Sequence, residues 1–259
     1  MKKFLCDKKF NIAYSVLAVL LMWAAWLIAF AAVKNEYLVP SFKQTARQFF
    51  TLFSQGFFWK AFGATLLRTV VAFLISFAVG LACACLATAV KPFAAFMRPV
   101  AALFRSLPTM AVLLIISVWL TPRTAPVVVA VLVLFPMIYS QLCDGIAGVD
   151  GALSEMAAVY KIGAKKTLFS IYVPQIAPTA LQQTGTNLSF GIKLVISAEV
   201  MAATYTAIGG LMVQAQSYIN LPRLAALTLC AVIFGIAAEM IFGALSSRVF
   251  KWKRGVKNA

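Results

Sequence analysis

Few residues of this chain can carry chemistry, and most of them lie in two segments. The chain contains no histidine, and its five cysteines are scattered without CxxC spacing. We therefore expect neither a disulfide framework nor a histidine-based metal site or general base. No GxxxxGK(S/T) sequence occurs, so we expect no phosphate cradle and no ATP hydrolysis by the chain itself.

The first segment is a polar stripe inside an otherwise apolar stretch. Polar residues recur there at spacings of three and four, which places them near one face of a helix. They are Gln182, Thr186, Ser189, Lys193 and Ser197. An ionisable group at membrane depth costs about 2.5 kcal/mol or more and normally faces a bundle interior or a water-filled cavity. We expect this stripe, together with Glu199, to line a translocation path.

The ionisable residues leave alternatives open. For Lys193 a role in the path and pairing with a neighbouring helix are both open, whereas a structural or gating role is favoured for Glu199. We expect Glu239 to be a buried hydrogen-bonding group, and Arg68 and Arg105 to extend toward opposite membrane surfaces. In another class of function, Lys193, Glu199 and Glu239 would form the ion or proton relay of a secondary transporter or channel. No inverted repeat with matching broken spans is detectable, which argues against that class.

Composition excludes a water-soluble globular domain. Of 259 residues, 63% are hydrophobic and 12% are charged, against roughly 45–50% and about 25% in soluble domains. A net charge of +16 would suit nucleic acid in a soluble protein, but most basic residues lie outside the apolar runs and indicate membrane topology instead. No nucleic-acid partner is expected. An intramembrane enzyme is poorly supported, because no cluster of acidic residues supplies an acid/base pair.

Six apolar stretches approach the roughly 20 residues that a helix needs to cross a bilayer core of about 30 Å. They cover 12–33, 65–90, 100–120, 125–142, 180–202 and 224–245. We therefore expect an all-α polytopic membrane protein with six transmembrane helices. The first stretch ends in an Ala-x-Ala sequence that fits a signal-peptidase site, but it exceeds the roughly 7–15 residues of a signal-peptide core. It is expected to be a retained anchor.

Charge predicts the orientation of these helices. Basic residues cluster before the first stretch and after the last, so the positive-inside rule places both termini in the cytoplasm. Segment 143–178 is then the longest cytoplasmic segment, and its pattern indicates helix, turn and helix between 153 and 172. Such a hairpin is a candidate docking surface.

This hairpin is the second chemistry-bearing segment, and it resembles the EAA loop of ABC importer permeases. The pattern of that loop is Glu-Ala-Ala, three residues, Gly, and then a helix that ends at an apolar residue and Pro. Glu155 matches the Glu, Ala157 the second Ala and Pro174 the closing Pro, and the spacing fits without a gap. The resemblance covers roughly 65–245 and is closest to the sulfonate, nitrate, taurine and thiamine-precursor permeases.

Two positions depart from the family pattern. Met156 stands where the first Ala would be, and Lys161 stands where the family usually has Gly, with Gly163 two residues further on. We therefore expect a turn of different shape. The residues that the resemblance assigns to coupling with an ATPase are Glu155, Met156, Ala157, Ala158, Tyr160, Lys161, Gly163 and Pro174.

The resemblance implies a type I ABC importer permease of the bacterial cytoplasmic (inner) membrane. Such a subunit contacts membrane lipid and forms a homodimer with two ATPase subunits, which bind ATP and Mg²⁺, and an extracytoplasmic solute-binding protein. No cofactor is expected on this chain. Residues 1–61 would hold the N-terminal tail, first helix and external loop, 62–247 the five-helix permease core with its coupling loop at 143–178, and 248–259 a basic tail. Lys193 would suit an anion, but the solute cannot be identified from the sequence.

Overall fold

A computed structural model of the chain describes residues 8–33 and 39–250, and these residues form helices and short connections without any strand. The helices are α1 (Lys8–Val33), α2 (Phe42–Phe53), α3 (Gly56–Ala89), α4 (Lys91–Ser106), α5 (Thr109–Trp119), α6 (Ala125–Ala147), α7 (Gly151–Val159), α8 (Ala164–Thr167), the π-helical η1 (Leu168–Tyr172), α9 (Val173–Met201), α10 (Ile208–Ser217) and α11 (Leu221–Val249). The expected all-α fold is confirmed.

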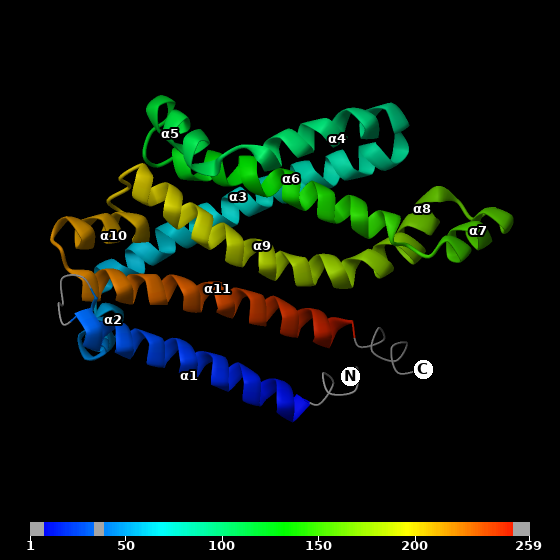
Figure 1. Cartoon of the computed structure of the whole chain (residues 1–259). Helices are drawn as coiled ribbons and strands as arrows, with labels where there is room; N and C mark the ends of the chain where they lie inside the picture. Colours follow the sequence, from blue (N-terminus) through cyan, green and yellow to red (C-terminus); the bar gives the residue numbers. More distant parts are fainter. Residues whose placement is uncertain (1–7, 34–38, 251–259) are drawn as a thin grey trace.

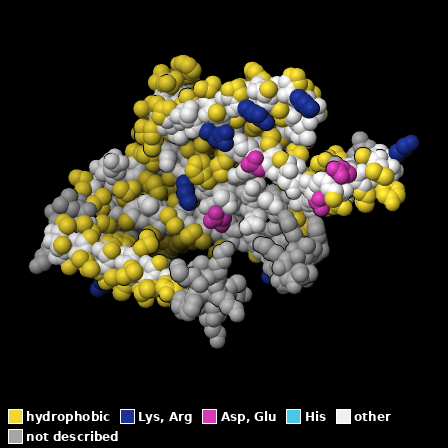
Figure 2. Space-filling model, turned by 45° about the vertical axis from the view of Figure 1, so that its right-hand side comes forward, with side chains coloured by type: hydrophobic (Ala, Val, Ile, Leu, Met, Phe, Trp, Pro, Cys, Tyr) yellow, Lys and Arg dark blue, Asp and Glu magenta, His cyan; other side chains and the backbone are white. Residues whose placement is uncertain are grey.

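Four long helices, α3, α6, α9 and α11, run along the molecule (Figure 1). α3 packs on α6, α9 packs on both α6 and α11, α4 and α5 cover α6, and α2 packs on α11. α10 lies at one end of the bundle, and α7 and α8 project from the other; we call these the α10 end and the hairpin end. The start of α1 and the end of α11 both lie toward the hairpin end (Figure 1). Hydrophobic side chains cover much of the face in Figure 2, and charged ones are sparse.

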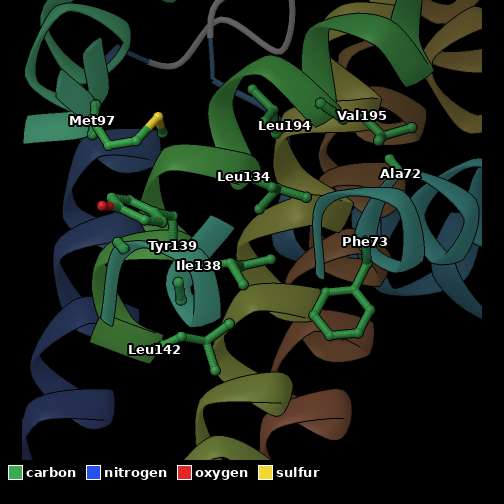
Figure 3. Close-up of a cluster of buried hydrophobic side chains, with 13 residues drawn as sticks. Ala72, Phe73, Met97, Leu134, Ile138, Tyr139, Leu142, Leu194 and Val195 are labelled. Atoms are coloured by element: carbon green, nitrogen blue, oxygen red, sulfur yellow. The ribbon is translucent and has the colours of Figure 1, made fainter. Parts of the chain in front are cut away.

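The core between α3, α6 and α9 combines apolar side chains with small residues (Figure 3). Phe73, Leu134 and Val195 are buried there. A methyl group on Gly191 would come within 3.2 Å of Thr69 and 3.4 Å of Leu134. Lipid tails are as apolar as these side chains, so membrane helices associate through close van der Waals packing at small residues rather than through hydrophobic burial.

α9 and α11 approach each other even more closely. A methyl group on Gly185 would lie 2.8 Å from Phe242 Cβ, and one on Gly235 would lie 3.0 Å from Ser189 Oγ. Glycine at both positions lets the two helix backbones come together. Ser189, a member of the predicted polar stripe, is buried by this contact.

The predicted spans correspond only partly to continuous apolar helices. α1, α3, α6 and α11 are each long and apolar enough to cross a membrane, and α4 with α5 would make a fifth span if the bent pair counts as one. α3 begins at Gly56 rather than at residue 65. α9 is 29 residues long but does not belong to this set, because polar residues interrupt its apolar surface.

The third predicted span, 100–120, is wrong as a single straight helix. α4 ends at Ser106, α5 begins at Thr109, and their axes differ by 89°. A residue before proline is displaced from the α region, and Leu107 before Pro108 accordingly has a ψ of 130°. The chain therefore turns sharply at this proline.

α1 is almost uncovered by the rest of the described structure. None of the residues in its apolar window Val16–Val33 is buried. Trp26 Nε1 donates a hydrogen bond to the Pro40 carbonyl oxygen at 3.1 Å, and the rings of Trp23 and Trp26 pack edge-on against Phe42 of α2. The single chain thus leaves an apolar helix for lipid or another protein to cover.

The turn after α7 is a Schellman motif, in which the chain leaves a helix through a left-handed residue. Ile162 N–H donates to Ala157 O at 2.9 Å, and Lys161 N–H donates to Ala158 O at 3.1 Å. The left-handed residue is Lys161, with a φ of 52°. Gly163 has no positive φ. The turn therefore has its left-handed residue at Lys161, the position where the EAA loop usually has glycine.

α9 and α10 end through the same pair of hydrogen bonds. Their left-handed residues are Ala203, with a φ of 49°, and Ile219, with a φ of 53°. Glycine is the usual residue at this position, so the sequence carries no marker of these three helix ends.

Replacing Lys161 by glycine should stabilise the turn. A non-glycine residue in the left-handed region costs roughly 1–2 kcal/mol, whereas glycine costs roughly 0.5–1 kcal/mol through the entropy of the unfolded chain. We expect Lys161→Gly to raise the free energy of unfolding by up to about 1 kcal/mol, seen as a higher thermal midpoint in detergent. Lys161→Ala removes the same charge but keeps the strain, so an equal rise with alanine would contradict this explanation.

Candidate functional site

The hairpin between α6 and α9 is fastened at its base. Asp150 caps α7, since its Oδ1 accepts a hydrogen bond from Ala152 N–H at 2.9 Å. The N–H of Asp150 donates to Gln175 Oε1 at 3.1 Å, which ties the start of α7 to α9. α8, η1 and α9 follow one another without interruption from Ala164 to Met201. The hairpin is therefore joined to α9 by continuous helix and by a hydrogen bond at its base rather than by a loose loop.

The tip of the hairpin presents an exposed face. Glu155, Met156 and Tyr160 are exposed, with Tyr160 at 73%, whereas Ala157 is buried and faces the membrane helices. Pro174 is half-buried at the base. The other predicted coupling residues that are exposed are Ala158, Lys161 and Gly163. Figure 2 shows the arm projecting from the body with both acidic and basic side chains on it.

An apolar cavity of about 950 Å³ lies beneath the hairpin. Its walls come from α3, α6, the hairpin and the first turns of α9. The α9 residues that line it are Val173, Ile176, Ala177 and Ala180. At 3.6 residues per turn, these residues point almost opposite to the polar stripe. The cavity and the stripe therefore occupy different faces of α9.

Most of the predicted polar stripe is accessible in the single chain. Gln182, Thr186 and Lys193 are exposed, and Ser197 is half-buried. The Lys193 side chain follows α11, with Cε 3.6 Å from where a methyl group on Gly235 would lie. Lys193 forms no ion pair within the described ranges. The stripe is thus available to a solute or to a second protein chain.

Glu199 faces away from the stripe and is fully buried. Its Oε1 accepts a hydrogen bond from Arg68 Nη1 at 2.9 Å, and its Oε2 accepts from Thr65 Oγ1 at 2.9 Å and from Gly209 N–H at 3.2 Å. Thr65 Oγ1 in turn accepts from Ile208 N–H at 3.1 Å. We call Thr65, Arg68, Glu199 and the first turn of α10 the latch.

The latch corrects the expectation for Arg68, which does not extend to a membrane surface. Its side chain is only 13% exposed and pairs with Glu199. A charge at membrane depth is costly when it is alone, and the pairing offsets that cost for both residues. Arg105, by contrast, donates from Nε to the Ala101 carbonyl of its own helix at 3.3 Å.

Two adjacent glycines let α10 reach the latch. A methyl group on Gly209 would collide with the backbone and Cβ of Glu199, and one on Gly210 would collide with the carbonyl oxygen of Thr204. The Thr204 hydroxyl donates to the Pro122 carbonyl at 2.6 Å, which joins this region to the connection between α5 and α6. The α10 end is therefore held together by one small, fully packed polar cluster.

The residues of the alternative relay are not brought together. Glu199 is enclosed by α3 and α10. Glu239 is exposed on α11, contrary to the expectation that it is buried, and has no ion-pair partner in the part of the chain that the structure describes. No continuous relay runs through Glu199 to Lys193.

The sequence identified Glu199 but not its partners. Thr65 and Arg68 lie 134 and 131 positions away. Their spacing of three residues puts them on one helix face, and that is the signal the sequence carries. Which carboxylate they meet depends on how α3 packs against α9.

These features define an all-helical, multi-pass membrane protein from which a helical hairpin projects. Residues 76–251 match the family described as binding-protein-dependent transport system inner membrane component. The chain belongs to this family. It is a transmembrane permease subunit of the ABC transporter type, which is a transport protein rather than an enzyme.

Individual relatives agree with this assignment. The chain is 23% identical over 189 residues to a protein described as an aliphatic sulfonates transport permease, SsuC of Bacillus subtilis (strain 168), covering 72% of this chain and 67% of that one. A crystal structure of an amino acid ABC transporter with histidines matches with 18% identity, a TM-score of 0.62, and coverage of 75% of this chain and 93% of that one. The methionine ABC transporter MetNI, in an inward facing conformation, matches with 16% identity, a TM-score of 0.54, and coverage of 74% and 93%. The two structures are similar in fold.

Enlarging Gly209 should loosen the latch. Overpacking a filled site typically costs about 1–3 kcal/mol, and a methyl group here meets the backbone and Cβ of Glu199. We expect Gly209→Ala to lower the thermal midpoint in detergent by several degrees. Gly243→Ala adds the same group to α11 where nothing lies within 4 Å, so it should leave the midpoint unchanged or slightly higher. Similar losses in both variants would show that the packing at Gly209 is not special.

Proposed function

We propose that this chain is the permease of an ABC importer, driven through its hairpin by two separate ATPase subunits that hold ATP and Mg²⁺. The observation that carries the proposal is the hairpin itself. It is tied to α9 at its base by Asp150 and Gln175, and its tip exposes Glu155, Met156 and Tyr160. A rigid element of this kind transmits rigid-body motion to the helices that continue from it.

The hairpin end is proposed to face the cytoplasm, where ATP is available. The clustering of basic residues near both termini supports this orientation through the positive-inside rule. The start of α1 and the end of α11 lie toward the same end as the hairpin (Figure 1). In this arrangement both termini are cytoplasmic, and the α10 end faces the extracytoplasmic solute-binding protein.

Two copies of the chain are proposed to enclose one translocation path. The exposed residues of the polar stripe support this, because Gln182, Thr186 and Lys193 have no cover in the single chain and polar groups at membrane depth normally face a bundle interior or water. Ser197 would extend the path toward the α10 end, and Ser189 would support it from behind. The uncovered α1 would pack on the second copy.

The proposed solute is a small anion of the aliphatic sulfonate kind. Lys193 supplies a cation on the proposed path, and the curated relative SsuC is described as a transporter of aliphatic sulfonates. The solute-binding protein would make the first selection, and Lys193 would offset the cost of removing water from the anion inside the membrane.

The proposed cycle is alternating access. ATP binding closes the two ATPase subunits, which draws the two hairpins together and opens the path toward the binding protein. Hydrolysis separates the hairpins again and opens the path toward the cytoplasm. The stiff connection from hairpin to α9 is what lets the ATPases act on the polar stripe.

Reversing the charge at Glu155 should detach the ATPase subunits. We expect them to co-purify with the wild-type chain from its native membrane in mild detergent, identified by mass spectrometry, and to be lost with Glu155→Arg. Asp144→Arg makes the same charge change on an exposed residue of α6 outside the hairpin, so it should retain them. A chain that purifies alone and still moves solute without ATP would overturn the proposal.

Removing the charge of Lys193 should impair transport without affecting assembly. A hydrogen bond to a charged group contributes about 1.5–3 kcal/mol, so we expect Lys193→Met to lower ATP-dependent uptake of ethanesulfonate about tenfold or more. Lys193→Arg keeps the charge and should retain most of the uptake. Unchanged uptake with methionine would place Lys193 outside the path.

A further inference from the structure

The latch contains an ionisable pair, Arg68 and Glu199, that lies outside the proposed translocation path. Glu199 has no exposed surface, and its two oxygens are occupied by Arg68, Thr65 and Gly209. A buried carboxylate that only satisfied α3 would need no contact with α10. Here the same carboxylate accepts from a side chain of α3 and from the backbone of α10.

The latch is also the means by which α10 is attached at its beginning. The N–H groups of the first helical turn lack partners within the helix. Those of Ile208 and Gly209 donate to Thr65 and Glu199 instead. A negative charge at a helix N-terminus is further favoured by the helix dipole. Residues from two other helices, α3 and α9, therefore hold α10 in place at one point.

The carboxylate sits at the far end of the element that begins in the hairpin. From Ala164 to Met201 the chain is continuously helical through α8, η1 and α9, and Glu199 lies two residues before the end. At 1.5 Å per residue, the distance along this rod from the hairpin to Glu199 is roughly 50 Å. The hairpin and the latch therefore lie at the two ends of one continuous helical element, which includes the π-helical η1 and Pro178.

We propose that the latch makes α10 and the adjoining end of α3 move together with the rod, so that Arg68 and Glu199 are positioning residues that carry motion from the hairpin to the α10 end. This inference rests on the proposed function. When the latch is intact, α10 must move with the continuous helix 164–201 as that helix shifts or rotates. When the latch is broken, the helix can move without moving α10.

The test measures the response to ATP separately in the hairpin and in α10. The complex of this chain with its ATPase subunits is compared with and without ATP by hydrogen exchange and mass spectrometry, reading amides of the hairpin (155–163) and of α10 (208–217). In the wild type we expect ATP to change the hydrogen-exchange rates of amides about threefold or more both in the hairpin and in α10. In Arg68→Met we expect the hairpin to respond as before and the response of α10 to disappear. Arg68→Lys, which keeps the charge and a donor, should restore it.

A second pair of variants makes a smaller change to the side chain and controls for misfolding of the Arg68 variants. Thr65→Val removes the hydroxyl that links Glu199 to Ile208 N–H, whereas Thr69→Val removes an equally buried hydroxyl of α3 that donates only to its own helix, at Thr65 O. We expect the valine at 65 to abolish the response of α10 and the valine at 69 to preserve it.

The outcomes separate this inference from the proposed function. If Thr65→Val and Arg68→Met respond to ATP at both sites as the wild type does, the latch transmits nothing and the inference is overturned. If the hairpin and α10 both lose their response to ATP in these variants, the role of the latch is structural only. That result also overturns the inference. If the wild-type hairpin itself ignores ATP, the proposed function has failed first.

Discussion

A fully buried carboxylate within helices that pack in a membrane must be paired, and this constraint organises the α10 end of the protein. Glu199 meets it with Arg68, with the Thr65 hydroxyl and with a backbone N–H of α10. The partners come from α3 and from α10. Apolar packing against lipid discriminates poorly between helix positions, whereas a charged hydrogen-bonded cluster requires one register. The meeting point of α3, α9 and α10 is therefore fixed by polar contacts, and the rest of the bundle is packed around it.

Two faces of α9 have different surroundings. One face carries the exposed polar residues Gln182, Thr186 and Lys193, and the other, near the hairpin end, lines an apolar cavity of about 950 Å³. Glycines at 185 and 191 bring α11 and the core close to it. Because the hairpin continues directly into α9, a partner that moves the hairpin acts on both faces. In the proposed function, energy therefore enters at one end of the chain and the solute passes near its middle.

The sequence predicts the class of fold and the hairpin well, because both depend on local patterns: long apolar runs, and a spacing from Glu155 to Pro174 that is read along one segment. It also identifies Glu199 as unusual for its surroundings. It does not predict that Arg68 pairs with Glu199, since that contact spans 131 positions and depends on helix packing. The break at Pro108 was missed because hydropathy continues across it. The sequence predicts a turn between 153 and 172, but not the left-handed conformation of Lys161, because glycine, the usual residue in that conformation, is absent there.

In the proposed mechanism, ATP bound by a partner at the hairpin drives this permease. The most direct measurement is uptake of ethanesulfonate into vesicles that contain the chain with its ATPase subunits and binding protein. The driving force would be either ATP on the hairpin side or a proton gradient. We predict uptake with hydrolysable ATP and none with the gradient alone. Uptake that follows the gradient in the absence of ATP would contradict this mechanism. The ionisable residues Lys193 and Glu239 would then be the candidates for coupling transport to protons.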